Sequence, residues 1–289
     1  MKITIDENAG FCFGVTKAME VANRYLDEHN TLYCLGDLVH NEEQMLQLCR
    51  RGLKIIEHSD LDNIHDSVVL LRAHGEPKST YTKLKQGNNT IIDATCPIVK
   101  NLQQKIIEAY NNNEKIYIYG KINHPEIQGI IGNINNDAVV FTNIEELSHL
   151  KKNDKITLYS QTTMSLLKYE EVISNLVEKG VLVNAIVSVC GSVSNRRTQL
   201  ENFCRNHQVI LFVAGKNSSN GRSLFLSCKD INPRSYFISS EEEIDLDWLK
   251  GVDDIGISGA TSTPIELLKS IRESIEQKTS SQHDQQSFR

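Results

Sequence analysis

The sequence predicts an α/β fold with mostly parallel sheets, and two observations carry this prediction. Short segments rich in Val, Ile, Leu and Tyr alternate along the chain with longer segments of helical periodicity. Such alternation is typical of strands joined by crossover helices, which form parallel sheets. The chain has 289 residues, of which 39 % are hydrophobic and 24 % charged, so it can bury the core of a globular protein.

The expected strands are short and recur at regular intervals. They are 2–5, 31–35, 68–71, 89–92, 115–119, 138–141, 155–159, 181–185, 209–213, 235–238 and 255–258. Helical patterns lie between many of them, for example at 15–29, 97–111, 165–179, 196–206 and 264–278. Several of these helices begin at Pro or directly after Ser or Thr, which suits the first turn of a helix.

The elements fall into three comparable blocks of three or four strands, so we expect three small α/β domains. Their bounds are 13–96, 97–190, and 191–278 together with 1–12. No repeat of individual residues and no linker marks the boundaries. The tail 279–289 is rich in Ser and Gln and is expected to be disordered.

Charge and hydropathy exclude several classes of protein. A formal net charge of -6 argues against nucleic acid as a partner, because such proteins must neutralise phosphates. The N-terminus has no apolar signal core, and no run of about eighteen apolar residues follows. We therefore expect a cytoplasmic protein that does not enter a membrane, whose seven cysteines are thiols or metal ligands and not disulfides.

Ligand-binding residue types follow nearly every predicted strand. In open parallel sheets, ligands bind beyond the carboxyl ends of the strands. Here those ends carry Cys, His, Ser, Thr, Asn or Glu, in segments 10–14, 36–41, 72–75, 93–97, 123–126, 160–163, 189–190, 215–220 and 259–264. This pattern predicts one polar site assembled from the whole chain.

Three cysteines, Cys12, Cys96 and Cys190, lie where a predicted strand passes into a helix. Helix N-termini favour thiolates, which are the metal-binding form of cysteine. Each of the three taken alone is more often a structural residue, and only their shared position favours a metal site of unspecified kind. The remaining cysteines are interpreted as small core residues: Cys34, Cys49, Cys204 and Cys228.

Three histidines, His40, His74 and His124, share the same kind of position. A single loop histidine is usually only polar surface, but three at strand ends suggest binding of a metal or an anion.

A second polar group consists of Ser218, Ser219 and Asn220 together with Ser262. Hydroxyl, amide and backbone N–H groups at the start of a helix can cradle a phosphate. The alternative is two polar turns that cap helices, which composition alone slightly favours. The segment is not a P-loop, because the GxxxxGK[ST] frame is absent.

Glu126, which follows His124-Pro125, is the best candidate for a proton donor, because a loop beside a histidine could tune its pKa. The alternative is an ordinary carboxylate in the first turn of a helix. Thr162 could relay a proton or contact a ligand hydroxyl, or it could cap the helix that follows.

Taken together in their order and spacing, these segments closely resemble the family of 4-hydroxy-3-methylbut-2-enyl diphosphate reductases (IspH/LytB). The matching motifs extend over about residues 1–277. They are Gly-Phe-Cys12, Val-His40-Asn, Ala-His74-Gly, Asp-Ala-Thr-Cys96-Pro, His124-Pro-Glu126, Gln-Thr162-Thr, Lys-Asn-Ser218-Ser219-Asn220 and Ser262-Thr-Pro.

The resemblance implies three α/β domains arranged like a trefoil around a central cavity. It implies a 4Fe–4S cluster on Cys12, Cys96 and Cys190 with one iron lacking a protein ligand, which may be found as 3Fe–4S. The implied reaction is a two-electron, two-proton reductive dehydroxylation of the allylic diphosphate to isopentenyl and dimethylallyl diphosphate. This is the last step of the methylerythritol phosphate route to isoprenoids, with ferredoxin or flavodoxin as the electron donor.

The resemblance also assigns roles to single residues. Glu126 matches the proton-delivering residue, and Thr162 matches its hydrogen-bonded companion at the substrate. The diphosphate-binding positions that match are His40, His74, His124, Ser218, Ser219, Asn220 and Ser262, with Thr261 as the alternative to the last.

The chain departs from the family pattern after the third cysteine, where Val193 and Arg197 stand in place of Thr and Gln. Two other classes of function are weighed against the reductase. An iron–sulfur sensor would keep the cysteines but would not need Glu126 or the Ser218–Asn220 segment. A transferase that binds a diphosphate without metal would contain neither iron nor sulfide.

Overall fold

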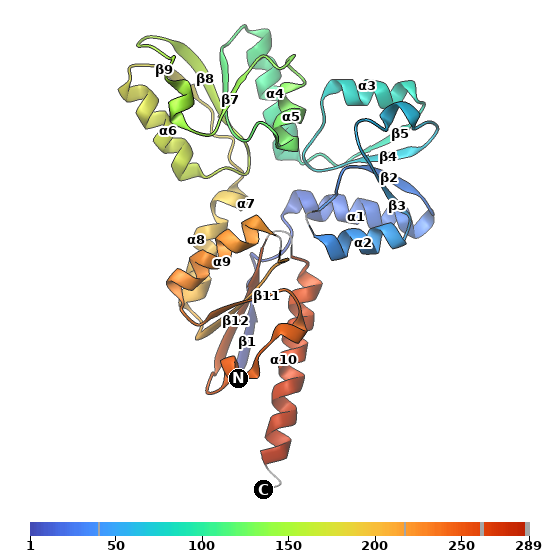
Figure 1. The fold of residues 1–289 in the computed structure, drawn as a ribbon, viewed down its shortest axis with the longest axis vertical. Helices are drawn as coiled ribbons and strands as arrows, with labels where there is room; N and C mark the ends of the chain where they lie inside the picture. Colours follow the sequence, from blue (N-terminus) through green and yellow to red (C-terminus); the bar gives the residue numbers. More distant parts are fainter. Residues whose placement is uncertain (40, 217, 261–262, 287–289) are drawn as a thin grey trace. The chain divides into compact units, whose positions relative to one another are not determined.

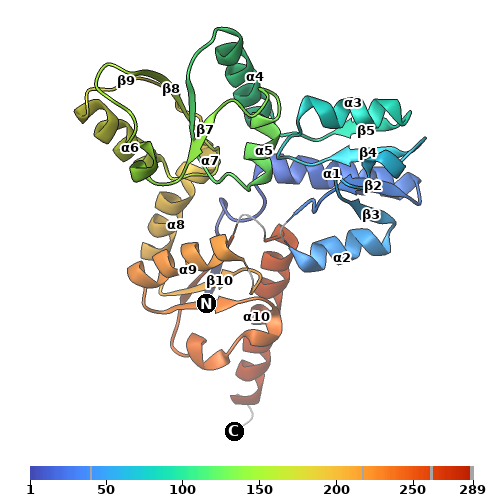
Figure 2. The same ribbon diagram turned by 45° about the horizontal axis from the view of Figure 1, so that its top comes forward.

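The computed structural model describes residues 1–39, 41–216, 218–260 and 263–286, and it confirms the α/β fold class. It contains three parallel sheets of four strands each, with helices packed on them (Figures 1 and 2). The chain divides into two compact units. Unit 1 is Met1–Phe13, Val39–Gln44 and Asn195–Arg289, and unit 2 is Gly14–Leu38 and Met45–Ser194. The trefoil arrangement and the three domain bounds stay predictions.

Unit 1 contains one sheet, in which the first strand of the chain lies beside the last. The strand order is β1 (Lys2–Ile5), β12 (Asp254–Gly259), β10 (Val209–Val213) and β11 (Ser235–Ile238). Its helices are α8 (Arg196–Arg205), α9 (Ser219–Ile231) and α10 (Ile265–Gln286), with short 3₁₀ turns η3 (Glu241–Glu243) and η4 (Leu246–Leu249).

Alternating residues of β10 divide the core of unit 1 into two layers. Val209, Leu211 and Val213 pack with α10 on one face. Ile210 and Phe212 pack with α8 and α9 on the other. A strand that is apolar on both faces is typical of a parallel sheet covered by helices on both sides.

Unit 2 contains two sheets. The first has the order β3 (Leu53–Ile56), β2 (Leu32–Leu35), β4 (Val68–Leu71) and β5 (Thr90–Asp93), with α1 (Phe13–Glu28), α2 (Glu42–Arg50), α3 (Lys78–Gln86) and η1 (Leu61–Asn63). The second has the order β7 (Val139–Phe141), β6 (Ile116–Tyr119), β8 (Lys155–Ser160) and β9 (Leu182–Ala185). Its helices are α4 (Pro97–Asn111), α5 (Pro125–Ile131), α6 (Leu166–Glu178) and the short α7 (Gly191–Ser194), with η2 (Ile144–Leu147).

All three sheets follow the same strand order. If β1 is set aside, the second strand in sequence of each sheet lies at the edge beside the first, and the third lies on the other side of the first. The fourth position is filled by the next strand along the chain in unit 2, but by the N-terminal β1 in unit 1. Because every pairing is parallel, the carboxyl ends of each sheet lie along one edge.

The two sheets of unit 2 meet where α5 packs on the segment that follows His74. A Cβ on Gly129 would lie 2.6 Å from the Gly75 carbonyl oxygen, so only glycine permits this approach. The Asn133 side chain accepts a hydrogen bond from the Lys78 backbone N–H at 2.8 Å. These contacts hold the second half of α5 and the residues after it against the segment that follows β4 in the first sheet.

Three expectations from the sequence were wrong in detail. Strand β3 was missed because it is an edge strand with only two buried residues, Leu53 and Ile56, around two exposed ones. Helix α10 continues past residue 278 to Gln286, since the segment after 278 contains no Gly or Pro to end it. Cys49 is exposed and not a core residue. Its neighbour Leu48 on α2 is buried, and successive helical residues point about 100° apart.

In the part of the chain that the structure describes, no helix is both long enough and apolar enough to cross a membrane.

A buried tyrosine provides a test of the second sheet of unit 2. Tyr169 is fully buried, and its hydroxyl donates to the Leu158 carbonyl oxygen at 2.6 Å. We expect Tyr169→Phe to lower the free energy of unfolding by about 1–2 kcal/mol, because a buried carbonyl loses a partner. The measurement is the urea midpoint followed by circular dichroism. The control is Tyr33→Phe, a tyrosine on β2, and an equal midpoint for both variants would contradict the expectation.

Candidate active site

The clearest functional arrangement in unit 2 is a buried carboxyl held by one threonine. Glu126 is only 1 % exposed, and its two oxygens accept hydrogen bonds from Thr162. The backbone N–H donates to Oε1 and the hydroxyl donates to Oε2, both at 2.7 Å. Thr162 is therefore a hydrogen-bond partner of Glu126. It is not a helix cap, because Ser165 is the N-cap of α6.

The environment of Glu126 favours its protonated form. Burial raises the pKa of the carboxyl above its ordinary value of 4.5, and this outweighs the two hydrogen bonds from Thr162, which lower it. No Lys or Arg among the described residues forms an ion pair with it. Glu126 lies in the first turn of α5, not in a loop as the sequence suggested, because Pro125 begins that helix.

Thr162 also connects this carboxyl to one of the predicted cluster ligands. Its carbonyl oxygen accepts a hydrogen bond from the Cys190 backbone N–H at 2.8 Å. One residue thus binds Glu126 with its N–H and hydroxyl and Cys190 with its C=O. The position of the Cys190 backbone therefore depends on the same residue that holds the Glu126 carboxyl.

Two of the predicted histidines lie together at the start of α5. The rings of His74 and His124 are edge to face, with centroids 5.3 Å apart. His124 is the N-cap of α5, and its Nδ1 accepts from the Glu126 backbone N–H at 3.1 Å. This bond leaves the proton of a neutral His124 ring on Nε2, where it can be donated to an anion.

Cys96 lies three residues after β5, the last strand of the first sheet of unit 2, and is the N-cap of α4. Its backbone N–H donates to the Ala73 carbonyl at 3.0 Å. A Cβ on Gly14 would lie 3.0 Å from the Cys96 Sγ, so a glycine at the start of α1 permits close approach of the helix to this thiol. Cys96 and Cys190 are both partly exposed, as a metal ligand facing a cofactor must be.

The remaining predicted residues belong to unit 1 or lie outside the described residues. Cys12, partly exposed, directly precedes α1. Ser218 is the N-cap of α9, and its Oγ accepts from the Gly221 N–H at 3.0 Å. Ser219 and Asn220 form the first turn of that helix. His40, Ser262 and the alternative Thr261 lie outside the described residues.

One buried residue beside the site was missed by the sequence analysis. Gln161 is 2 % exposed, its Oε1 accepts from the Lys121 N–H at 3.1 Å, and its Nε2 donates to the Thr163 hydroxyl at 2.7 Å. It holds the start of the loop that leads to His124. The available signal was its place in the polar segment 160–163, which drew attention only to Thr162.

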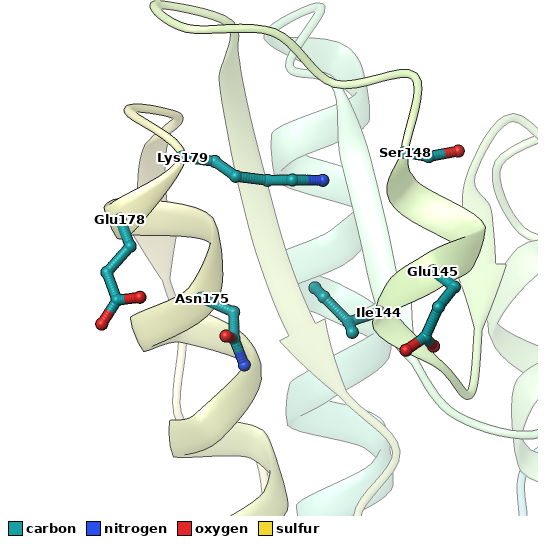
Figure 3. Close-up of a pocket in the computed structure, with 6 residues that line it drawn as sticks. All are labelled: Ile144, Glu145, Ser148, Asn175, Glu178 and Lys179. Atoms are coloured by element: carbon teal, nitrogen blue, oxygen red, sulfur yellow. The ribbon is translucent and has the colours of Figure 1, made fainter.

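None of the predicted site residues lines the pocket shown in Figure 3. It is formed between η2 and the end of α6, and it is lined by Ile144, Glu145, Ser148, Asn175, Glu178 and Lys179. Within the described ranges, no group of three or more His, Cys, Asp or Glu residues is placed to hold a metal ion. The cluster ligands therefore stay a prediction.

The protonation of Glu126 predicts a pH-dependent difference in stability. Because the folded pKa is raised, the unfolded chain loses this proton first as the pH rises. The contribution of the protonated Glu126 carboxyl to the stability of the fold is complete below about pH 4.5, and it is lost as the pH rises through the folded pKa. As the pH rises from about 4.5 to the folded pKa, the wild type should lose stability that Glu126→Gln keeps. The free energy of unfolding of the variant, relative to that of the wild type, should therefore rise by about 1.4 kcal/mol for each pH unit of the pKa shift. Urea unfolding of the metal-free protein at several pH values measures this, and a constant difference would contradict it.

Comparison with known proteins places the chain in one family. Residues 3–276 match the family described as LytB protein. A protein from Bacteroides fragilis named 4-hydroxy-3-methylbut-2-enyl diphosphate reductase is 43 % identical over 282 residues, covering 95 % of this chain and 97 % of the relative. One of the same name from Parabacteroides distasonis is 43 % identical over 278 residues, covering 94 % and 96 %.

A solved structure of (E)-4-hydroxy-3-methyl-but-2-enyl diphosphate reductase, described as the terminal enzyme of the non-mevalonate pathway, has the same fold. It is 28 % identical, with a TM-score of 0.81 over 95 % of this chain and 99 % of that one. With a family match over nearly all its length, this chain belongs to the LytB protein family.

Proposed function

We propose that this chain catalyses the reductive dehydroxylation of 4-hydroxy-3-methylbut-2-enyl diphosphate to isopentenyl and dimethylallyl diphosphate. The observation that carries the proposal is the buried Glu126 carboxyl, joined through Thr162 to Cys190. It puts a group suited to hold a proton and a group suited to hold a metal cluster in one hydrogen-bonded unit. The relatives are named as reductases of this diphosphate, which supports the proposal.

Cys12, Cys96 and Cys190 are the residues we propose as ligands of an iron–sulfur cluster. All three are free thiols, each is partly exposed, and each directly precedes a helix. Three thiolates fit a cluster that keeps one iron open, and the missing Cβ of Gly14 leaves room beside the Cys96 sulfur. When bound, a 4Fe–4S cluster would supply the electrons and a Lewis-acidic iron for the departing hydroxyl.

The diphosphate is proposed to bind to neutral and weakly basic donors. His74 and His124 lie together at the start of α5, and the His124 ring bears its neutral-state proton on Nε2. Ser218, with the backbone N–H groups of the first turn of α9, fits an anion at a helix N-terminus. Ser219, Asn220, His40 and Ser262 are proposed to complete this set.

Glu126 is proposed to deliver the proton. Its burial favours the neutral carboxylic acid, so it can hold a proton at a pH where an exposed glutamate is ionised. The Thr162 hydroxyl holds the carboxyl in one orientation and can reform its bond after the proton has left. The iron–sulfur sensor considered above would have no use for this group.

The electrons are proposed to come from a small redox protein, ferredoxin or flavodoxin. A reducing compartment such as the cytoplasm suits a site that depends on three unoxidised thiols. No nucleic acid and no membrane is part of the proposal.

The function is tested with protein purified without oxygen. We expect iron and sulfide to copurify, and a chemically reduced sample to convert the substrate into both products. Cys96→Ser should lose most of the iron, whereas Cys49→Ser, at the exposed cysteine on α2, should keep it. A sample that contains the cluster and forms neither product would refute the activity, and equal iron in both variants would refute the ligand assignment.

The role of Glu126 is tested separately. Glu126→Gln should keep the cluster spectrum and substrate affinity while turnover falls about 10²- to 10⁴-fold, the usual contribution of a general acid. The matched control is Glu114→Gln, because Glu114 accepts a hydrogen bond from the Thr157 hydroxyl at 2.5 Å on the same sheet. Turnover is measured from the rate at which the reduced donor is oxidised. Normal turnover in Glu126→Gln would remove this residue from the mechanism.

A further inference from the structure

A fully buried ion pair lies at the carboxyl edge of the sheet of unit 1. Arg196, the first residue of α8, donates from Nη1 to the Asp6 carboxylate at 2.7 Å, and both side chains are at most 4 % exposed. Its Nη2 donates to the Ser258 hydroxyl at 2.8 Å and to the Gly259 carbonyl at 2.9 Å. The Ser258 hydroxyl donates to the same Asp6 oxygen at 2.8 Å.

Asp6 also organises the loop that follows β1. Its backbone N–H donates to the Ile257 carbonyl at 2.8 Å, which extends the pairing of β1 with β12. Its Oδ1 accepts from the Asn8 N–H at 3.0 Å, and its carbonyl accepts from the Ala9 N–H at 2.9 Å. One residue thus determines the path of the chain after the strand ends.

The contribution of this ion pair to the free energy of folding does not by itself explain why it is buried. Removing two charges from water is costly, and a buried ion pair often contributes no more than apolar residues of the same size. The Arg196 Nε is buried and has no hydrogen-bond partner among the described residues, which adds a further penalty. Such pairs are better explained by the geometry that they impose.

The three segments joined by this network each lead to a predicted site residue. Residues 7–11 separate Asp6 from Cys12, and residues 191–195 separate Cys190 from Arg196. Gly259 is followed by the segment that contains Ser262. Cys190 is also held through its backbone by Thr162, whereas the path to Cys12 depends on the Asp6 loop.

We infer that Asp6 and Arg196 are positioning residues, which hold the Cys12 loop against the start of α8 so that the Cys12 thiol is presented for the cluster. This inference rests on the proposed function for the meaning of Cys12, but not for the anchoring itself. Arg196 acts through the loop and does not touch the substrate or the cluster.

The neighbouring arginine provides a matched control. Arg197 lies on the same turn of α8 but is exposed, and it forms an ion pair at 3.0 Å with Glu201, one turn further along the helix. Arg196→Met and Arg197→Met remove the same charge from adjacent positions. Combining Arg196→Met with Asp6→Asn avoids leaving a buried carboxylate without a partner, so the double variant should fold.

The first experiment uses the metal-free protein and measures alkylation rates of single cysteines by iodoacetamide and peptide mass spectrometry. In the Asp6→Asn/Arg196→Met variant, we expect Cys12 to react several-fold faster than in the wild type, because its loop opens more often. Cys96, held by the Ala73 carbonyl in unit 2, should react at the wild-type rate and is the internal reference. Arg197→Met should change neither rate.

The second experiment measures iron per chain after anaerobic reconstitution. We expect the double variant to hold less iron than the wild type and Arg197→Met to hold the same amount. Arg196→Lys, which keeps the charge but lacks the two forked Nη groups that bind Asp6 and the Gly259 carbonyl, should restore the iron only in part. If the wild type itself takes up no iron, the proposed function fails, while the alkylation result still decides whether Asp6 and Arg196 anchor the loop.

A milder variant, Ser258→Ala, keeps both charges and removes only the bridging hydroxyl. It serves if the double variant does not fold, and a smaller but selective acceleration at Cys12 is expected. An unchanged Cys12 rate in a folded variant would overturn the inference. Equal acceleration of Cys12 and Cys96 would also overturn it, because the pair would then serve general stability alone.

Discussion

A carboxyl group that has no counter-ion can stay buried only if donors surround it or if it keeps its proton. Glu126 has two donors, both from Thr162, and burial still raises its pKa. The rest of the site in unit 2 is arranged around this requirement. Helix α5 brings Glu126 and His124 to the sheet edge, Gln161 holds the loop before them, and Thr162 extends the same hydrogen bonds to Cys190.

The scaffold that meets this requirement is one strand order used three times. Each sheet is parallel, so the loops after its strands lie at one edge of that sheet, and these loops carry the Cys, His, Ser and Thr residues that we predict to be functional. Unit 1 differs in that its fourth strand is the N-terminal β1. β1 is thereby the edge strand of a sheet whose other strands come from residues 209–259, and a buried ion pair fixes the loop that follows β1.

The fold class could be predicted, because alternating apolar segments are a local feature of the sequence, and the candidate site was placed at the strand ends because polar strand ends are a local feature too. The partners of the site residues could not. Thr162 and Glu126 are 36 residues apart, and Arg196 and Asp6 are 190 apart, so neither pair leaves a local signal. Strand β3 escaped prediction because two buried residues at a sheet edge make too short a pattern.

The pairing of β1 with β12 also determines when the protein can finish folding on the ribosome. Lys2 of β1 pairs with Asp254 of β12, so β1 cannot form its strand pairing until about 250 further residues have been synthesised. At 5–20 residues per second, the delay is roughly 13 to 50 s. During that time β1 lacks its partner strand β12, and the Asp6 carboxylate lacks its hydrogen bond from Ser258. Until β12 is made, Cys12 lacks the Asp6–Ser258 anchor that we propose for its loop, so we expect the proposed cluster to be loaded only after β12 has been synthesised.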